Sequence, residues 1–333
     1  MDIVMDPYTG LAYLSCGSLN ARQRWLHPDD EYDMSFESEA DHIYVMDEND
    51  TYSEIRAMEM SNNGSLQPFS QGLRLHGFDI YWDPNDPRDM TFILVNHQVA
   101  HGAVSIFSYN RGSDHMVHVE TVRSDLLHSP NNILAMSKRA FYATNDMAFT
   151  KGFMRTISSN TRLPDGHVVY HSDGGEFSVA ASNIRYPNGI AKHNGWIYVA
   201  SCTDPGVQIY KEDTRGTLSF CGRIVYDDGI PDNIFVDPEN GHLYSTMFLK
   251  AKESHKFFRN PSLNTTKLAG TKIVRLIQRD HPSSGFDIES LLIDSGELMP
   301  SATIAAIQRR NQIQRMLVGC VMCDFLVVCE SIT

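Results

Sequence analysis

The stretch DPENGHLYSTM, from Asp237 to Met247, joins a tight-turn signal to a short strand. Asp, Pro, Asn and Gly are residues that β-turns favour, and the apolar run that follows is typical of a strand. The same phrase returns with different letters as DPYTGLAYLSC from Asp6, DPNDPRDMTFILVNH from Asp83, SKRAFYATND from Ser137, KHNGWIYVAS from Lys192 and RRNQIQRMLVGCV from Arg309. Such repetition is typical of an architecture built from similar β units.

A second strand often follows the first, as in DHIYVMD from Asp41, VSIFSYN from Val104 and VQIYKED from Val207. Long amphipathic helices are nearly absent. The segment EIRAMEM, from Glu54, predicts one short helix, and IESLLI, from Ile288, predicts either one helical turn or a strand.

Units at a spacing of roughly 45–80 residues predict an all-β fold, a six-bladed β-propeller of four-stranded blades. A β-sandwich or two stacked β domains is the alternative, although sandwiches rarely need this many similar units. Neither a Pro/Gly/Ser linker nor a run of charges divides the chain, so we expect one domain over residues 1–333. The innermost strand of each blade faces a central channel, where functional residues from distant parts of the chain should meet.

The chain is acidic, with 28 Lys and Arg against 41 Asp and Glu and a formal net charge of −13. This balance excludes a general nucleic-acid binder, which needs a basic face for the phosphates, and it is compatible with cation binding. The longest apolar stretch, from Met316 to Cys329, contains Asp324 and is shorter than the ~20 residues of a membrane-spanning helix. We therefore expect no membrane span; the sequence does not indicate the oligomeric state.

The six cysteines are too few and too scattered for a disulfide-rich scaffold. Cys320 and Cys323 have CxxC spacing, but they alternate with apolar residues and no second Cys or His pair follows, so we expect them in a strand rather than on a metal. Sequons at Asn49, Asn63 and Asn264 would suit a secreted glycoprotein, although such tripeptides also arise by chance.

Three innermost strands are introduced by amides or acids where apolar residues would be usual: PNN at 130–132, YPNGI at 186–190 and PDNIFVD at 231–237. At corresponding blade positions they would send a ring of oxygen atoms into the channel. Such a ring suits a hard cation such as calcium, which takes about 6–8 oxygen ligands, whereas zinc would want more His and Cys. Ordinary turn chemistry is the alternative, because Asn and Asp beside Pro and Gly are common in β-turns.

Two histidines flank the DPNDPRD hairpin: His76 lies just before one strand, and His97 ends the next. They could meet at one end of a blade and act as a proton relay. A capped or solvated turn histidine is the alternative for each.

Together these phrases resemble the serum paraoxonase/arylesterase family, calcium-dependent six-bladed propellers that hydrolyse lactones and aryl esters. The resemblance runs from about Asp2 to Glu330. It rests on LHG followed by VNH, then LLHSPNNILAM, FYATND, PNGI and PDNIFVDPENGHLY, and a closing strand that ends in CE.

The resemblance implies two calcium sites and a catalytic pair. The residues that match ligands of the catalytic calcium are Asn131, Asn188, Asp232 and Asn233. Those that match the second, structural calcium are Asp2, Asn132 and the backbone carbonyl of Phe78. Asn132 replaces the family's usual aspartate, which lowers the charge of that site. His76 and His97 match the proposed catalytic dyad, and Asn96 resembles a substrate-pocket position.

The start of the chain departs from the family. Met1 stands where the family has a glutamate ligand, and the cysteine that would pair with Cys329 would lie upstream. The resemblance therefore implies an N-terminally truncated chain that lacks a signal peptide. The protein would then be secreted, and otherwise cytoplasmic, so its localisation stays open. Met147 and Phe248 replace pocket histidines of some animal members, which implies a more apolar pocket.

The function implied is hydrolysis of a small lactone or aryl ester, with calcium polarising the carbonyl and His76, assisted by His97, deprotonating the attacking water. The chain has no GxSxG elbow, which excludes an α/β-hydrolase. Two alternatives stay open: a catalytically impaired, calcium-stabilised scaffold, and a sugar-lactone hydrolase related to gluconolactonases. The residues do not name the natural substrate.

Overall fold

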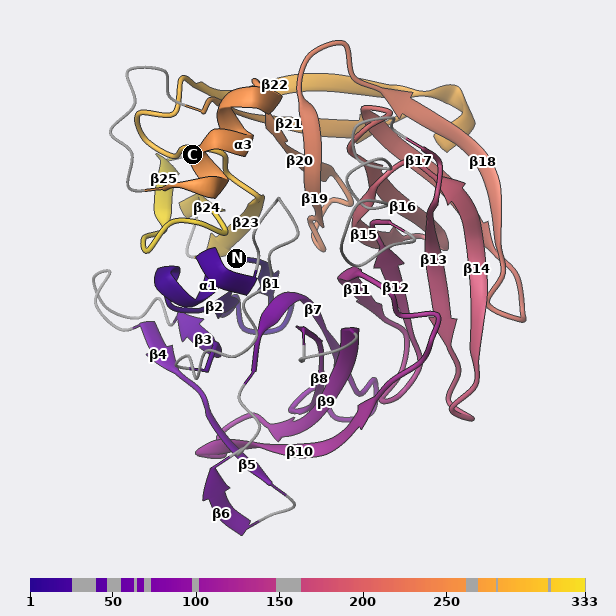
Figure 1. Ribbon diagram of the computed structural model, residues 1–333, viewed down its shortest axis with the longest axis vertical. Coiled ribbons are helices and arrows are strands. Elements are labelled where there is room, and N and C mark those ends of the chain that lie inside the picture. The colour runs from indigo at the N-terminus through magenta and orange to yellow at the C-terminus, as the bar shows by residue number, and fades with distance from the viewer. Residues whose placement is uncertain are drawn as a thin grey trace.

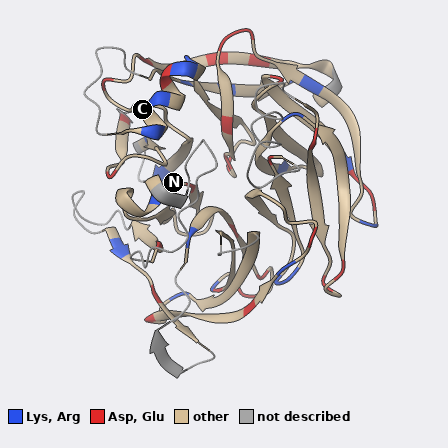
Figure 2. Cartoon of the chain, viewed as in Figure 1, with Lys and Arg blue, Asp and Glu red and all other residues tan. Residues whose placement is uncertain are grey.

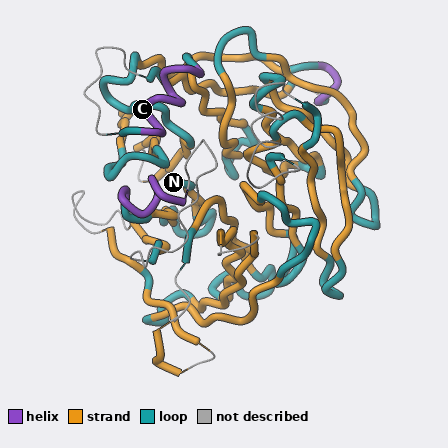
Figure 3. The backbone as a smooth tube through the Cα atoms, viewed as in Figure 1, coloured by secondary structure: helices purple, strands orange, loops and turns teal. Residues whose placement is uncertain are grey.

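The structure, a computed structural model, describes residues 1–25, 40–46, 55–62, 65–68, 73–97, 102–147, 163–261, 269–279, 281–310 and 313–332. Its strands form six sheets around a common centre, and its helices are short (Figure 1; Figure 3). This arrangement is a six-bladed β-propeller, which confirms the predicted fold class.

Four of the blades have four antiparallel strands in chain order from the channel outward. The first contains β1 (Ile3–Met5), β2 (Ala12–Cys16), β3 (His42–Met46) and β4 (Ile55–Ala57). The third contains β11 (Pro130–Ala135), β12 (Phe141–Asn145), β13 (Gly166–His171) and β14 (Phe177–Ile184). The fourth contains β15 (Pro187–His193), β16 (Trp196–Ser201), β17 (Gly206–Glu212) and β18 (Leu218–Val225). The fifth contains β19 (Ile230–Val236), β20 (Leu243–Phe248), β21 (Thr271–Gln278) and β22 (Phe286–Asp294).

The other two blades depart from the expected four strands. The second contains β7 (Leu75–Trp82), β8 (Asp89–His97), β9 (Gly102–Asn110) and β10 (His115–Val122), extended by β5 (Glu59–Asn62) and β6 (Ser65–Pro68). Within the described residues, the sixth has three strands, β23 (Ile304–Arg310), β24 (Ile313–Gly319) and β25 (Val327–Ile332).

The segment from Glu54 that was expected to be a short helix forms strands instead. Only Met58 separates β4, in the first blade, from β5, which pairs in parallel with β10 of the second. This pairing covers an outer sheet edge that would otherwise expose unpaired backbone groups. Tertiary pairing therefore overrides the local helix preference. The ambiguous segment from Ile288 is also a strand, within β22.

The helices are peripheral: α1 (Leu19–Trp25), α3 (Ala251–Arg259) and the 3-10 turn η1 (Pro282–Ser284). No helix in the described ranges is long and apolar enough to cross a membrane. Basic and acidic residues are interspersed around the ring (Figure 2).

A tyrosine recurs at the same register position of the second strand in four blades, directly opposite the innermost strand. These fully buried residues are Tyr13, Tyr142, Tyr198 and Tyr244. Three of them reach the next blade. The Tyr142 hydroxyl donates to Glu212 at 2.9 Å, the Tyr198 hydroxyl to Gln278 at 2.9 Å, and the Tyr13 hydroxyl to the Met90 sulfur at 3.9 Å. The repeated phrase thus supplies contacts between blades as well as strands.

The first and last blades are side by side (Figure 1) and contact each other through β1 and β23. The Thr303 hydroxyl donates to the Met1 carbonyl at 3.0 Å, and the Gln308 amide donates to the Gly10 carbonyl at 2.7 Å. These bonds help to complete the ring between the two ends of the described chain.

All six cysteines are free thiols. Cys320 directly follows β24 and Cys323 lies in the next turn, so the expectation that both belong to a strand is wrong. The apolar run is interrupted there because the chain must turn between β24 and β25. The sequons at Asn49, Asn63 and Asn264 lie outside the described residues.

Candidate functional site

The predicted oxygen ligands meet in the channel, at the beginning of the innermost strands. Each of these seven residues is buried: Asp2, Phe78, Asn131, Asn132, Asn188, Asp232 and Asn233. Their strands are linked directly, since the Asn132 amide donates to Asn233 Oδ1 at 2.8 Å and Asp2 Oδ2 accepts from the Phe78 N–H at 3.3 Å. Five blades therefore contribute to one cluster of oxygen atoms, which we call the channel cluster.

A β-bulge explains how these polar side chains come to lie in the channel. The register with the second strand shifts between Pro130 and Ile133, between Pro187 and Ile190, and between Pro231 and Ile234. The second blade has the same irregularity between residues 75 and 78. A bulge places two residues opposite one and changes where their side chains point. The recurring Pro-Asn and Pro-Asp-Asn phrases are thus the bulges of successive blades.

Glycines let the innermost strands approach closely at this level. A Cβ added to Gly77 would lie 2.6 Å from Asn132 Oδ1, and one added to Gly189 would lie 2.6 Å from the Asn233 Cα. Real side chains do not tolerate such contacts. The glycines that follow His76 and Asn188 are therefore a steric requirement of the channel cluster.

Buried polar groups of the cluster fit a hard cation. Burial raises the pKa of Asp232 to about 7 and that of Asp2 to about 6. The Asn188 amide donates to the Cys202 sulfur at 3.6 Å, and Asn188 Oδ1 is buried without a hydrogen-bond partner. A cation would satisfy this oxygen and offset the buried carboxylates. Among the described residues no group of three His, Cys, Asp or Glu side chains forms a metal site, so the donors are mainly amides.

The two predicted histidines meet where β7 begins and β8 ends. His76 Nδ1 lies 3.2 Å from His97 Nε2, and the ring planes are inclined by 50°. The pair lies beside the channel cluster, since Gly77 and Phe78 directly follow His76. The sequence prediction that these residues lie together is borne out by this distance.

Three supporting residues escaped the sequence reasoning. Ser15 accepts from the Asp2 N–H at 3.0 Å and donates to the His76 carbonyl at 3.1 Å, so it ties the histidine pair to the cluster. Thr144 accepts from the Asn132 N–H at 3.0 Å and donates to the Asn188 carbonyl at 2.7 Å. Asp41 accepts from the Leu75 N–H at 2.7 Å and holds the start of β7. Only their polar character, within an apolar strand for Ser15 and Thr144 and just before one for Asp41, could have indicated them.

The structure describes the two apolar residues that the resemblance placed in the substrate pocket. Met147 is buried just after β12, and Phe248 ends β20 with its ring 5.4 Å from that of Phe258. Asn96, expected near the substrate, is fully buried. Its amide accepts from the Arg74 N–H at 3.0 Å and donates to the Ser105 hydroxyl at 3.3 Å, so it supports the end of the β7–β8 hairpin.

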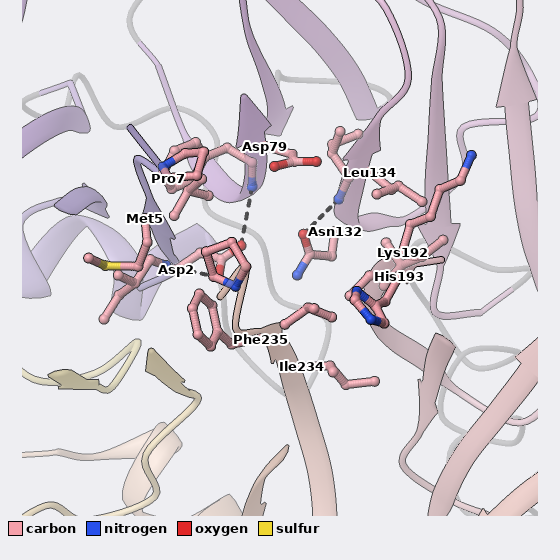
Figure 4. Close-up of a pocket in the computed structure, with 18 of the residues that line it drawn as sticks. Asp2, Met5, Pro7, Asp79, Asn132, Leu134, Lys192, His193, Ile234 and Phe235 are labelled. Atoms are coloured by element: carbon pink, nitrogen blue, oxygen red, sulfur yellow. Dashed lines mark hydrogen bonds between the residues drawn. The ribbon is translucent and has the colours of Figure 1, made fainter. Parts of the chain in front are cut away.

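On the other side of the cluster, a cavity of ≈ 270 Å³ continues along the innermost strands. It begins at Asp2, Phe78 and Asn132 and extends to Lys192 and His193 (Figure 4). The sequence reasoning did not anticipate this cavity, because its walls come from different blades.

A protein-family model described as Arylesterase matches residues 34–330 of this chain. Human serum paraoxonase/arylesterase 2 is 28% identical over 204 residues, which cover 61% of this chain and 55% of the human protein. Serum paraoxonase/lactonase 3 of Mus musculus is 25% identical over 316 residues, which cover 93% of this chain and 80% of that protein. The chain thus spans about half the length of some curated relatives and most of others.

Among solved structures, a putative gluconolactonase matches with a TM-score of 0.53 at 11% identity, covering 100% of this chain and 88% of that one. A luciferin-regenerating enzyme matches with a TM-score of 0.50 at 14% identity, covering 97% and 84%. At these identities the likeness shows the fold alone.

Proposed function

Because the chain belongs to the arylesterase family, we propose that it is a calcium-dependent hydrolase of carboxylic esters, with a small lactone or aryl ester as substrate. The observation that carries this proposal is the histidine pair, with 3.2 Å between His76 Nδ1 and His97 Nε2, next to the channel cluster. A proton acceptor and a cation site side by side are what water attack on an ester requires.

The channel cluster would hold the calcium ions. Asn131, Asn188, Asp232 and Asn233 would hold the catalytic ion, and Asp2, Asn132 and the Phe78 carbonyl the second one. The unpartnered Asn188 Oδ1 supports this assignment. When bound, calcium would polarise the ester carbonyl and stabilise the negative charge that develops on its oxygen.

The histidine pair would take a proton from the attacking water and pass it to the leaving oxygen. In the tautomer in which His76 Nδ1 donates to His97 Nε2, the lone pair of His76 lies on Nε2 and can accept a proton from water. The water oxygen then bonds to the carbonyl carbon, the ester C–O bond breaks, and the leaving oxygen takes the proton. His97 would stabilise the imidazolium of His76.

Hydrolysis of a γ-lactone and of phenyl acetate, measured in calcium, in EDTA and after calcium is restored, tests the proposal. We expect activity that EDTA abolishes and calcium restores, while magnesium restores little because it demands a smaller octahedral site. Hydrolysis that persists in EDTA, with no calcium found by elemental analysis, would refute the calcium mechanism. Bound calcium without hydrolysis of either ester would instead favour the calcium-stabilised scaffold.

A further inference from the structure

One carboxylate in the cavity below the channel cluster has no part in the proposed function. Asp79 follows Phe78, whose carbonyl would bind the second calcium, and lines the same ≈ 270 Å³ cavity as Asp2 and Asn132. Asp2, Asp79 and Asn132 line one cavity, and Figure 4 shows Lys192 and His193 across it. A second carboxylate therefore faces the space where only one was expected.

Asp79 is held in the same way as Asp2. Asp2 accepts from the N–H of the next residue, Ile3, at 3.0 Å and from Phe78 in the neighbouring blade at 3.3 Å. Asp79 accepts from the N–H of the next residue, Ile80, at 2.8 Å and from Ala135 in the neighbouring blade at 2.8 Å. A carboxylate has about four acceptor positions, so each side chain retains the capacity to bind a cation.

Asn132 cannot balance the charge of a divalent ion at this place. Its Oδ1 accepts from the Ile133 N–H at 2.7 Å, and its Nδ2 donates to Asn233 Oδ1 at 2.8 Å, so the amide bridges two innermost strands. Lys192, a cationic side chain of the cavity wall, is paired with Glu212 at 2.7 Å. In the described ion pairs, neither Asp2 nor Asp79 is matched with a basic side chain.

We propose that Asp79 is a ligand of the second calcium and supplies the carboxylate that Asn132 lacks. The ion is then held between Asp2 and Asp79, with the Phe78 carbonyl and the Asn132 amide completing the protein ligands. The inference rests on the proposed calcium-dependent function, but it concerns metal binding and can be tested without a substrate.

Calcium stoichiometry tests the assignment directly. By titration calorimetry on the calcium-stripped full chain, we expect two ions for the wild type. Asp79→Asn should weaken one site at least about tenfold and leave the other, because calcium affinity follows the number of charged ligands. Asp232→Asn should weaken the other site, and Asp86→Asn, on an exposed turn, is the matched control. Two sites of unchanged affinity in Asp79→Asn would overturn the proposal.

Terbium gives a second readout, since Trp82 lines the cavity and can transfer excitation to a lanthanide bound there. The wild type should show tryptophan-sensitised terbium emission that calcium competes away. Trp82→Phe should lose the emission but keep both calcium sites, whereas Asp79→Asn should lose the emission together with one site. Emission that Asp79→Asn leaves unchanged would contradict the assignment.

If Asp79→Asn does not fold, the carboxylate can be moved from position 79 to position 132. The double variant Asp79→Asn/Asn132→Asp should recover folding, the second calcium and the terbium signal, because it returns one carboxylate to the site. A double variant that folds without the second ion would overturn the proposal. Two calcium sites, of which one depends on Asp79, in a chain that hydrolyses no ester, would refute the proposed function alone.

Discussion

The histidine pair depends on a small number of residues that hold it in place. The His97 N–H donates to the Arg74 carbonyl at 2.9 Å, and Ser15 donates to the His76 carbonyl at 3.1 Å. Both histidines are therefore fixed by the backbone at the end of one hairpin.

Replacing His76 by Gln should lower lactone turnover by about 10²–10⁴-fold, the usual loss when a positioned general base is removed. Calcium content and melting temperature should change little, because the imidazole is not a ligand. His115→Gln, at the start of β10 in the same blade, is the control. Near-wild-type turnover of His76→Gln would mean that another group activates the water.

A buried histidine elsewhere should make stability depend on pH. His171 is 1% exposed, its ring lies 4.8 Å from that of Phe141, and burial lowers its pKa. The unfolded chain then binds the proton more readily, so stability is fully present above the unfolded value of about 6.5 and is lost as the pH falls toward the folded value.

His171→Gln should therefore reduce the loss of stability between pH 7 and pH 5, measured by urea unfolding against the wild type. The exposed His281→Gln variant serves as the control. An unchanged acid slope in His171→Gln would show that this imidazole is protonated equally well in both states.

At the scale of the element, the innermost hairpin is the unit that builds the site. In the third, fourth and fifth blades this hairpin begins with a bulge and presents its polar residues there, then returns to a regular ladder with the tyrosine-bearing second strand. In β15, Gly189 follows the predicted ligand Asn188, and the backbone of β19 at Asn233 lies against this glycine. Ligand position and strand spacing are therefore coupled.

Gly189→Ala tests this coupling. Its methyl group would collide with the Asn233 backbone, so β15 and β19 must separate. Overpacking of this kind usually costs about 1–3 kcal/mol. We expect a lower melting temperature and weaker calcium binding by calorimetry. Gly174→Ala, whose added methyl group meets nothing closer than 3.6 Å, should behave like the wild type, and equal behaviour of the two variants would show that β15 has room to move.

At the scale of the molecule, the channel cluster joins five of the six blades, so a bound cation would tie the ring together at its centre. Without a cation, burial raises the pKa of Asp232, and the negative charge of Asp2 adds to this effect. Metal binding and folding are then linked.

Calcium should raise the free energy of unfolding by about 2.7 kcal/mol when its free concentration is 100 times Kd, and EDTA should remove this gain. Calorimetric melting in calcium, in EDTA and in magnesium at equal ionic strength measures the effect. Identical melting in all three would mean that the native state binds no calcium, in which case the channel cluster has another role.

The amino-acid sequence by itself determined the repeating β units, the residues of the channel cluster and the histidine pair. These features are local: a turn phrase, a strand-length apolar run and a polar pair before it can be recognised without knowing the neighbours. The resemblance to the paraoxonases then assigned roles to the same residues. The short helix expected from Glu54 does not form, because part of that segment pairs as β5 with the outer edge of β10 in the second blade.

Only the tertiary structure decided how these pieces meet. The bulges direct the predicted ligand side chains into the channel. Gly77 and Gly189 let strands of different blades lie in contact. Ser15 and Thr144 form hydrogen bonds that connect residues far apart in the chain. The position of Asp79 in the same cavity as Asp2 could not be foreseen, because strand alternation alone does not say which residue faces a cavity walled by five strands. Such contacts depend on the closure of the ring, and a pattern within one blade carries no information about the position of the next.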